Sequence, residues 1–212
     1  MKLHYSIQST YSQKALLAFY EKGVDFTPVQ VSVLDPVASA EYKKTYPLGK
    51  IPLLTGDDIF IPESTIIIEY LENEFPVSGT KLIPEDKTVA RRVRFKDRVF
   101  DLYLNNPIAT IFFDSLKPIE KQNPEAVAKA HQTIDVVYGF MEQDLKNNNF
   151  ASGNEFSMAD CAAFAPLFYA QKLHSFAHLP NISAYFNRLM QRKSVQRVLA
   201  ELLPALEKFN SK

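Results

Sequence analysis

The spacing of apolar positions along the chain changes near residue 77. Before this point, short apolar runs typical of strands alternate with segments whose apolar residues recur at helical spacing. After it, long segments repeat apolar residues at the helical period, and strand-like runs are absent. The pattern predicts a small α/β domain over residues 1–76, a linker over residues 77–86 and an all-helical domain over residues 87–212.

In the first domain the expected elements follow the order strand, helix, strand, irregular segment, strand, strand, helix. This is the order of a thioredoxin-like fold. Gly23 is placed to end the first helix, because glycine readily adopts the left-handed conformation found just after many helices. Gly56-Asp57 marks a turn between two short strands. The expected strands are residues 3–6, 26–33, 51–54 and 58–61, and the expected helices are residues 11–22 and 64–75.

In the second domain the pattern predicts helices only. Pro107 should kink the first of them, since proline lacks the backbone donor and crowds the preceding turn. Ser157 and Asp160 have the spacing of a capping box at the start of an apolar helix. Cys161 follows on that helix and is expected to be a small buried hydrophobe. The predicted helices are residues 87–116, 124–146, 158–173, 182–192 and 195–209.

Composition excludes several classes of protein. The 24 basic residues balance 24 acidic ones, so no global field favours nucleic acid or an anionic membrane. The single cysteine excludes an internal disulfide framework. The amino terminus lacks the features of a signal peptide, and no apolar stretch approaches the roughly 18–20 residues that span a bilayer. A cytoplasmic protein is expected. His174 and His178 are spaced like a helical metal pair, but no cysteine or intervening carboxylate supports them, so no metal is expected.

Three segments then resemble, in order and spacing, the amino-terminal domain of glutathione transferases. They are residues 9–14 between the first strand and helix, residues 49–54, and residues 61–64 before the second helix. In the other half, residues 156–160 and 179–182 are similar to helix-start segments of the same family. The resemblance covers nearly the whole chain. It implies the glutathione transferase fold, in which a thioredoxin-like glutathione-binding domain precedes an all-α domain.

The resemblance also implies a clamp for a γ-glutamyl peptide. Pro52 after Ile51 matches the family's cis-proline, beside which an extended peptide pairs as an added strand. Glu63 and Ser64 open a helix, whose free N–H groups and positive dipole end favour a carboxylate. Ser64 could add a hydroxyl donor, and Glu63 could pair with an ammonium group. Lys50 could pair with the glycyl carboxylate. An ordinary helix cap and a solvated lysine are the alternatives.

The thiol of glutathione must be activated. A thiol with a pKa near 8.5 is only about 3% thiolate at pH 7, and lowering that pKa by about 2 units requires roughly 2.7 kcal/mol. One hydroxyl hydrogen bond to the anion can supply about 1.5–3 kcal/mol. Ser9 aligns with the activating serine of the family's serine-type classes and is therefore the first candidate for this hydroxyl. Thr10, Tyr11 and Tyr5 are the next candidates, in that order. Helix capping by Ser9 and strand packing by Tyr5 are the alternatives. The segment has no cysteine, which argues against mixed-disulfide chemistry.

The leading hypothesis is an enzyme that joins the glutathione thiolate to a small hydrophobic electrophile. Glutathione is then a co-substrate, and the resemblance implies a homodimer. From the balanced charge and the absence of a long apolar stretch, no membrane or direct nucleic-acid partner is expected. Four side chains could line the electrophile's pocket or could equally belong to the core: Tyr103, Ile108, Phe112 and Tyr169.

A second resemblance points to an adaptor. Residues 11–12, 21–24 and 69–76 are similar to the stringent starvation protein branch, whose members have the transferase fold, bind RNA polymerase and lack transferase activity. That branch carries a Pro-His-Pro surface motif just beyond this point, whereas residues 77–79 read Val-Ser-Gly. A polymerase-binding adaptor is therefore the alternative to the enzyme.

Overall fold

The computed structural model describes residues 1–211 and divides them into two compact units. The first unit contains residues 1–82 together with residues 192–211, and the second contains Ile83–Gln191. The division lies within the linker expected from the sequence, but the carboxy-terminal segment joins the first unit.

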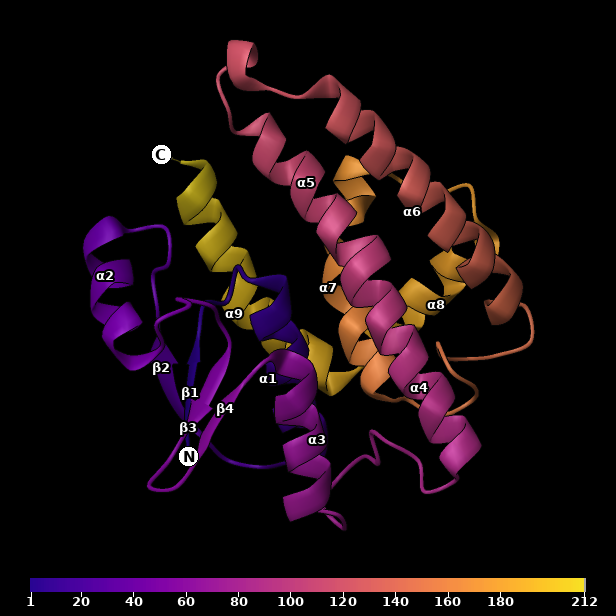
Figure 1. The fold of residues 1–212 in the computed structure, drawn as a ribbon. Helices are drawn as coiled ribbons and strands as arrows, with labels where there is room; N and C mark the ends of the chain where they lie inside the picture. The colour runs from indigo at the N-terminus through magenta and orange to yellow at the C-terminus, as the bar shows by residue number, and fades with distance from the viewer. Residues whose placement is uncertain (212) are drawn as a thin grey trace. The chain divides into compact units, whose positions relative to one another are not determined.

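A four-stranded sheet forms the centre of the first unit (Figure 1). Strand β1 (Lys2–Tyr5) pairs in parallel with β2 (Thr27–Gln30) and antiparallel with β3 (Leu53–Thr55). Strand β3 also pairs antiparallel with β4 (Phe60–Pro62), so the strand order is β2-β1-β3-β4. This mixed sheet, with a helix between β1 and β2, confirms the thioredoxin-like fold expected for the first domain.

Helices α1 (Thr10–Lys22) and α3 (Ser64–Glu74) pack against each other in the first unit. Helix α1 ends as predicted, because Gly23 adopts the left-handed conformation with a φ of 64°. Leu3 and Leu54, which lie opposite each other in the sheet, are fully buried. The periodicity of the chain therefore indicated α1, α3 and the four strands correctly.

Helix α2 (Pro36–Thr45) occupies the segment that was expected to be irregular. Its start carries local signals, since the Asp35 side chain accepts the Ala38 N–H at 2.7 Å and proline stands in the first turn. Only Tyr42 of this helix is buried, so apolar periodicity is absent. Tyr42 packs in a small core with Val31, Tyr46 and Leu53.

The last helix, α9 (Lys193–Asn210), packs along α1 in the first unit, although the sequence placed it in the helical domain. Arg192, just before α9, donates to both carboxylate oxygens of Glu21 at 2.8 and 2.6 Å. Apolar spacing predicts such a helix without identifying its packing partner, which is why the sequence did not assign α9 to this unit. The apolar side chains that α9 buries are Val195, Val198, Leu199 and Leu202.

The second unit is helical, as expected. Helix α7 (Met158–Leu173) has the predicted bounds, and the predicted capping box is present at Ser157 and Asp160. Cys161 is buried, as predicted. The other helices are α4 (Lys87–Val99), the π-helical segment η1 (Phe100–Asn105), α5 (Asn106–Ser115), the short 3-10 helix η2 (Ile119–Lys121), α6 (Pro124–Leu145) and α8 (Pro180–Met190).

A π-helical segment lies directly before Pro107, the residue at which a kink was expected. The backbone N–H of Asn106 donates to the Asp101 carbonyl, one residue further back than in an α-helix. Pro107 follows in the first turn of α5, where its missing N–H is tolerated. The segment expected as one long helix is therefore α4, η1 and α5 in succession. Within residues 1–211, no helix is both long and apolar enough to span a membrane.

Candidate active site

Three predicted motifs lie at the same edge of the sheet in the first unit. Strand register places His4, near the end of β1, opposite Leu53 at the start of β3, and Leu53 in turn lies opposite Pro62 at the end of β4. The loop after β1, the loop before β3 and the helix start after β4 therefore meet at that edge. This convergence follows from strand pairing, which joins positions far apart in the sequence.

The Ile51–Pro52 peptide bond is cis, as the family resemblance implied. Helix α2 supports the loop before it, because the Tyr42 hydroxyl donates to the Lys50 carbonyl at 2.8 Å. Burial raises the pKa of Tyr42 to about 12, so this hydroxyl remains a donor at neutral pH. The Lys50 side chain is exposed.

Glu63 has an unusual backbone conformation at the start of α3. Its φ of 71° is the only positive φ of a non-glycine residue within the described part of the chain. Such a conformation costs on the order of 1–3 kcal/mol and is found preferentially at functional sites. Glu63 is exposed, and its side chain makes no capping hydrogen bond. Its carboxylate is thus placed beside the helix start without being used for capping.

Ser64 and Lys14 complete the helix start. Ser64 is buried as the first residue of α3. Lys14, from α1, is also buried, and its ammonium group donates to the Thr65 hydroxyl at 2.8 Å. A buried cation here adds positive potential to the helix dipole and favours an anion. Lys14 was not identified as a site residue from the sequence. The pattern that could have identified it is a lysine among the apolar residues of the first helix.

Ser9 caps α1. Its Oγ accepts the Ser12 N–H at 3.3 Å, so Ser9 has the capping role that the sequence offered as the alternative to thiol activation. Capping uses the hydroxyl as an acceptor and does not consume its proton, which can be donated elsewhere. Thr10 and Tyr11 begin the helix, and both are half-buried.

Tyr5 has its hydroxyl committed to α9. It donates to the Glu201 carboxylate at 3.0 Å, and the side chain is only 3% exposed. Burial, followed by the nearby Glu201 charge, raises the pKa of Tyr5 to about 12. These contacts make Tyr5 the least available of the four candidate hydroxyls.

The four candidate pocket residues of the second unit have different environments. Tyr103 is 53% exposed, whereas Ile108 is 2% exposed and belongs to the core. Phe112 and Tyr169 are half-buried, with ring centroids 6.4 Å apart. Tyr103, Phe112 and Tyr169 are therefore accessible enough to line a pocket. Ile108 is part of the core, which was the alternative to a place in the pocket.

His174 and His178 do not form a helical pair. Helix α7 ends before them, and His174 instead approaches His131, with 2.6 Å between their Nδ1 atoms. The other ring nitrogen of His174 bonds the Asp135 carboxylate at 2.7 Å. Both nitrogens of His174 are thus engaged by protein groups.

Comparison with known proteins gives matches over both units. Residues 3–81 match the glutathione S-transferase N-terminal domain, and residues 104–193 match the glutathione S-transferase C-terminal domain. The chain is 27% identical over 212 residues to glutathione S-transferase F6 of Arabidopsis thaliana, covering 90% of this chain and 95% of that relative. It is 32% identical over 154 residues to protein LigF of a Sphingobium strain, covering 70% of this chain and 58% of LigF.

The fold also matches solved structures. Glutathione S-transferase 1-6 from Anopheles dirus species B superposes with a TM-score of 0.87 over 100% of both chains, at 20% identity. Together, the two domain matches include most of the chain and the three motifs at the sheet edge. The chain therefore belongs to the glutathione S-transferase family of enzymes.

Proposed function

We propose that the protein is a glutathione transferase that joins the thiolate of glutathione to a small hydrophobic electrophile. The observation that carries this proposal is the convergence of the cis-proline loop, the start of α3 and the Ser9 loop at one edge of the sheet. Together these segments offer groups of the right type for the peptide backbone, the γ-glutamyl end and the thiol.

Binding would use both ends of the peptide. The γ-glutamyl carboxylate would accept from the free N–H groups at the start of α3 and from the Ser64 hydroxyl, in the positive potential of Lys14. Glu63 would pair with the γ-glutamyl ammonium group. The backbone beside Ile51-Pro52 would pair with the extended peptide, and Lys50 would pair with the glycyl carboxylate.

Thiol activation would use the Ser9 hydroxyl as a donor. Its oxygen accepts from the Ser12 N–H, which orients the hydroxyl while leaving its proton to bond the sulfur anion. A hydrogen bond to a charged acceptor contributes about 1.5–3 kcal/mol, enough to lower a thiol pKa by about 1–2 units. Thr10 and Tyr11 are the next candidates, followed by Tyr5.

The thiolate would attack the electrophile directly, forming a sulfur–carbon bond. The electron pair of that bond comes from sulfur, and the displaced pair leaves with the leaving group or moves into the electrophile. Positioning both reactants converts a bimolecular encounter into an effectively unimolecular step. Tyr103, Phe112 and Tyr169 would contact the hydrophobic electrophile. We further infer a cytoplasmic homodimer, in keeping with the family.

Calorimetric titration with glutathione tests the binding site. The wild type should bind, and Glu63→Ala and Ser64→Ala should each weaken binding about 10-fold or more, since each loses a charge-assisted hydrogen bond. Glu74→Ala is the matched control, because Glu74 is exposed at the opposite end of the same helix. Absence of heat from the wild type at millimolar glutathione would contradict the proposal. No observation on the described residues favours the polymerase-binding alternative.

A further inference from the structure

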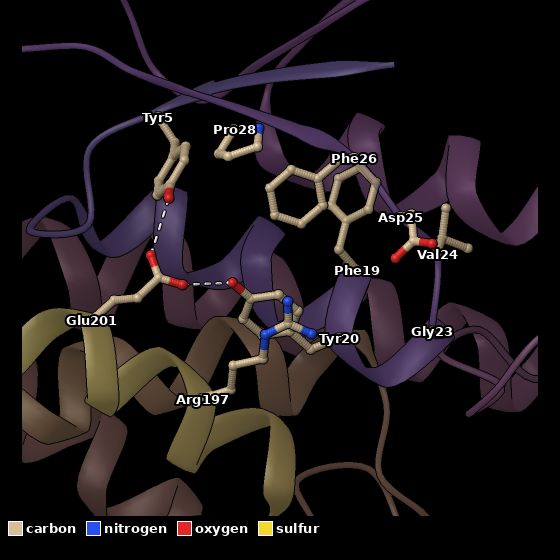
Figure 2. A pocket seen from close by; sticks show the side chains of 10 residues that line it. All are labelled: Tyr5, Phe19, Tyr20, Gly23, Val24, Asp25, Phe26, Pro28, Arg197 and Glu201. Carbon is tan, nitrogen blue, oxygen red and sulfur yellow. Dashed lines mark hydrogen bonds between the residues drawn. The ribbon is translucent and has the colours of Figure 1, made fainter.

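One carboxylate on α9 links the two elements that flank the Ser9 loop. Glu201 accepts the Tyr5 hydroxyl on one oxygen at 3.0 Å and the Tyr20 hydroxyl on the other at 2.8 Å. Figure 2 shows the two bonds converging on the Glu201 side chain. Tyr5 ends β1 just before the loop, and Tyr20 lies on α1 after it. Glu201 thus connects the strand that enters the loop to the helix that leaves it; we call these three residues the Glu201 clamp.

The loop between these elements is also hydrogen-bonded to its surroundings. The Gln8 side-chain amide donates to the Ala205 carbonyl of α9 at 3.5 Å. On the other side, the Gln13 side-chain amide of α1 donates to the Ile7 carbonyl at 2.9 Å. The position of the loop therefore depends on both α1 and α9, so a shift of α9 relative to α1 would move the segment that carries Ser9.

Helix α9 is itself anchored to α1. Besides the paired bonds from Arg192, Glu21 accepts the Ser194 hydroxyl. Burial alone would raise the pKa of Glu21, but hydrogen bonds from Arg192, Ser194 and Thr80 lower it below its ordinary value. Further along the helix, the Arg197 guanidinium lies 4.0 Å from the centroid of the Tyr20 ring. These contacts hold the start of α9 against α1 and so help to fix the position of Glu201 on that helix.

The two tyrosines are well suited to act as permanent donors. Burial, and then the Glu201 charge, raises the pKa of Tyr5 to about 12. Burial and the bond to Glu201 raise the pKa of Tyr20 as well. Both hydroxyls therefore keep their protons over the neutral range and can hold the carboxylate between them.

A cavity of about 330 Å³ adjoins the clamp (Figure 2). Both tyrosines of the clamp contribute to its lining, although Tyr5 is only 3% exposed. The cavity is lined by Tyr5, Phe19, Tyr20, Gly23, Val24, Asp25, Phe26, Pro28, Arg197 and Glu201.

We propose that Glu201 is a positioning residue for thiol activation, which aims the Ser9 hydroxyl at the glutathione sulfur by holding Tyr5 and Tyr20 together. This inference rests on the proposed function, because it concerns the same loop. Glu201 lies beyond residues 104–193 that match the C-terminal domain of the family, so the family match does not include this contact.

The test compares Glu201→Ala and Glu201→Gln with the wild type. Calorimetry gives the dissociation constant of glutathione, and the ultraviolet absorbance of the thiolate gives the pKa of the bound thiol. We expect Glu201→Ala to raise that pKa by about one unit and lower kcat about 10-fold below the thiol pKa, while glutathione affinity changes less than about threefold. Glu201→Gln keeps one acceptor oxygen and should be intermediate. Glu207→Gln, exposed on the same helix, is the control and should match the wild type.

A second measurement does not depend on glutathione. Amide hydrogen exchange in peptides that cover residues 6–11 should be faster in Glu201→Ala and unchanged in Glu207→Gln. If Glu201→Ala does not fold, Tyr20→Phe removes one bond of the clamp without altering a candidate activating hydroxyl, and it takes the place of Glu201→Ala in both measurements.

The outcomes separate the two proposals. If amide hydrogen exchange in residues 6–11 is unchanged in Glu201→Ala, the clamp does not order the loop, whether or not the wild type binds glutathione. Faster exchange with an unchanged thiol pKa and kcat overturns the positioning role. A wild type that does not bind glutathione overturns the proposed function, and the role of Glu201 in thiol activation is overturned with it; loop exchange then still shows whether the clamp orders the loop.

Discussion

Lys22 and Glu72 form a buried ion pair between α1 and α3. The Lys22 Nζ lies 3.0 Å from the Glu72 Oε1, and the two side chains are 0% and 6% exposed. The same Glu72 oxygen accepts the Leu82 N–H at 2.8 Å. The Glu72 carboxylate of α3 therefore contacts both α1 and the segment that ends the first stretch of this unit at Leu82.

Removing one partner should expose the cost of an unpaired buried charge. Lys22→Met should lower the free energy of unfolding by about 3–5 kcal/mol, as measured by urea denaturation. Lys44→Met, in the exposed pair with Glu41, is the control and should change stability by less than about 1 kcal/mol. Equal effects of the two substitutions would show that burial does not set the strength of the Lys22–Glu72 pair.

Gly79 should not tolerate a side chain. Its φ is 54°, and a Cβ added there would lie 2.2 Å from the Glu21 carbonyl oxygen at the end of α1. Gly79→Ala should destabilise the protein by more than about 1 kcal/mol, because both the conformation and the space exclude it. Gly139→Ala is the matched comparison, since Gly139 lies within α6 with no atom near the added Cβ. That substitution should stabilise the protein by up to about 1 kcal/mol. Thermal denaturation of both variants measures the contrast, and a stable Gly79→Ala variant would refute the close approach.

Ser9→Ala should separate thiol activation from helix capping. The pKa of bound glutathione should rise by about 1–2 units, which lowers kcat about 10- to 100-fold below the thiol pKa. Loss of the cap should also cost about 0.5–2 kcal/mol of stability. Asp35→Ala removes the cap of α2 and is the control: it should lower stability without changing the thiol pKa. An unchanged thiol pKa in Ser9→Ala, measured by thiolate absorbance, would assign the activating role to Thr10, Tyr11 or Tyr5.

Alkaline pH should destabilise the protein through Tyr5 and Tyr42. Both have a pKa raised to about 12 by burial, so the folded state favours their protonated form. Their contribution is fully present below the unfolded pKa near 10 and is lost as pH rises from about 10 to about 12. Urea denaturation across this range should show a shallower loss of stability in Tyr5→Phe and Tyr42→Phe than in the wild type. Identical pH profiles would contradict the raised pKa values.

Local signals predicted much of the fold. Apolar spacing identified the four strands and most helices, Gly23 ended the first helix, and the Ser157–Asp160 capping box began α7 at the predicted residue. Strand ends were less accurate, since the expected strand over residues 26–33 is reduced to Thr27–Gln30 in the structure. Helix α2 was missed because it buries a single side chain, and periodicity detects only helices with an apolar face.

The candidate site, like the fold, could be predicted from the sequence only in part. The sequence by itself determined the motifs, namely Ile51-Pro52, Glu63-Ser64 and the hydroxyl-rich segment from Ser9, because each is a short run of neighbouring residues. Only the tertiary structure decided that strand pairing brings them to one edge, that Lys14 lies beside the start of α3, and that α9 joins the first unit through Glu201. These relationships connect residues up to 196 positions apart in the sequence, and no local pattern records which distant surfaces will pack together.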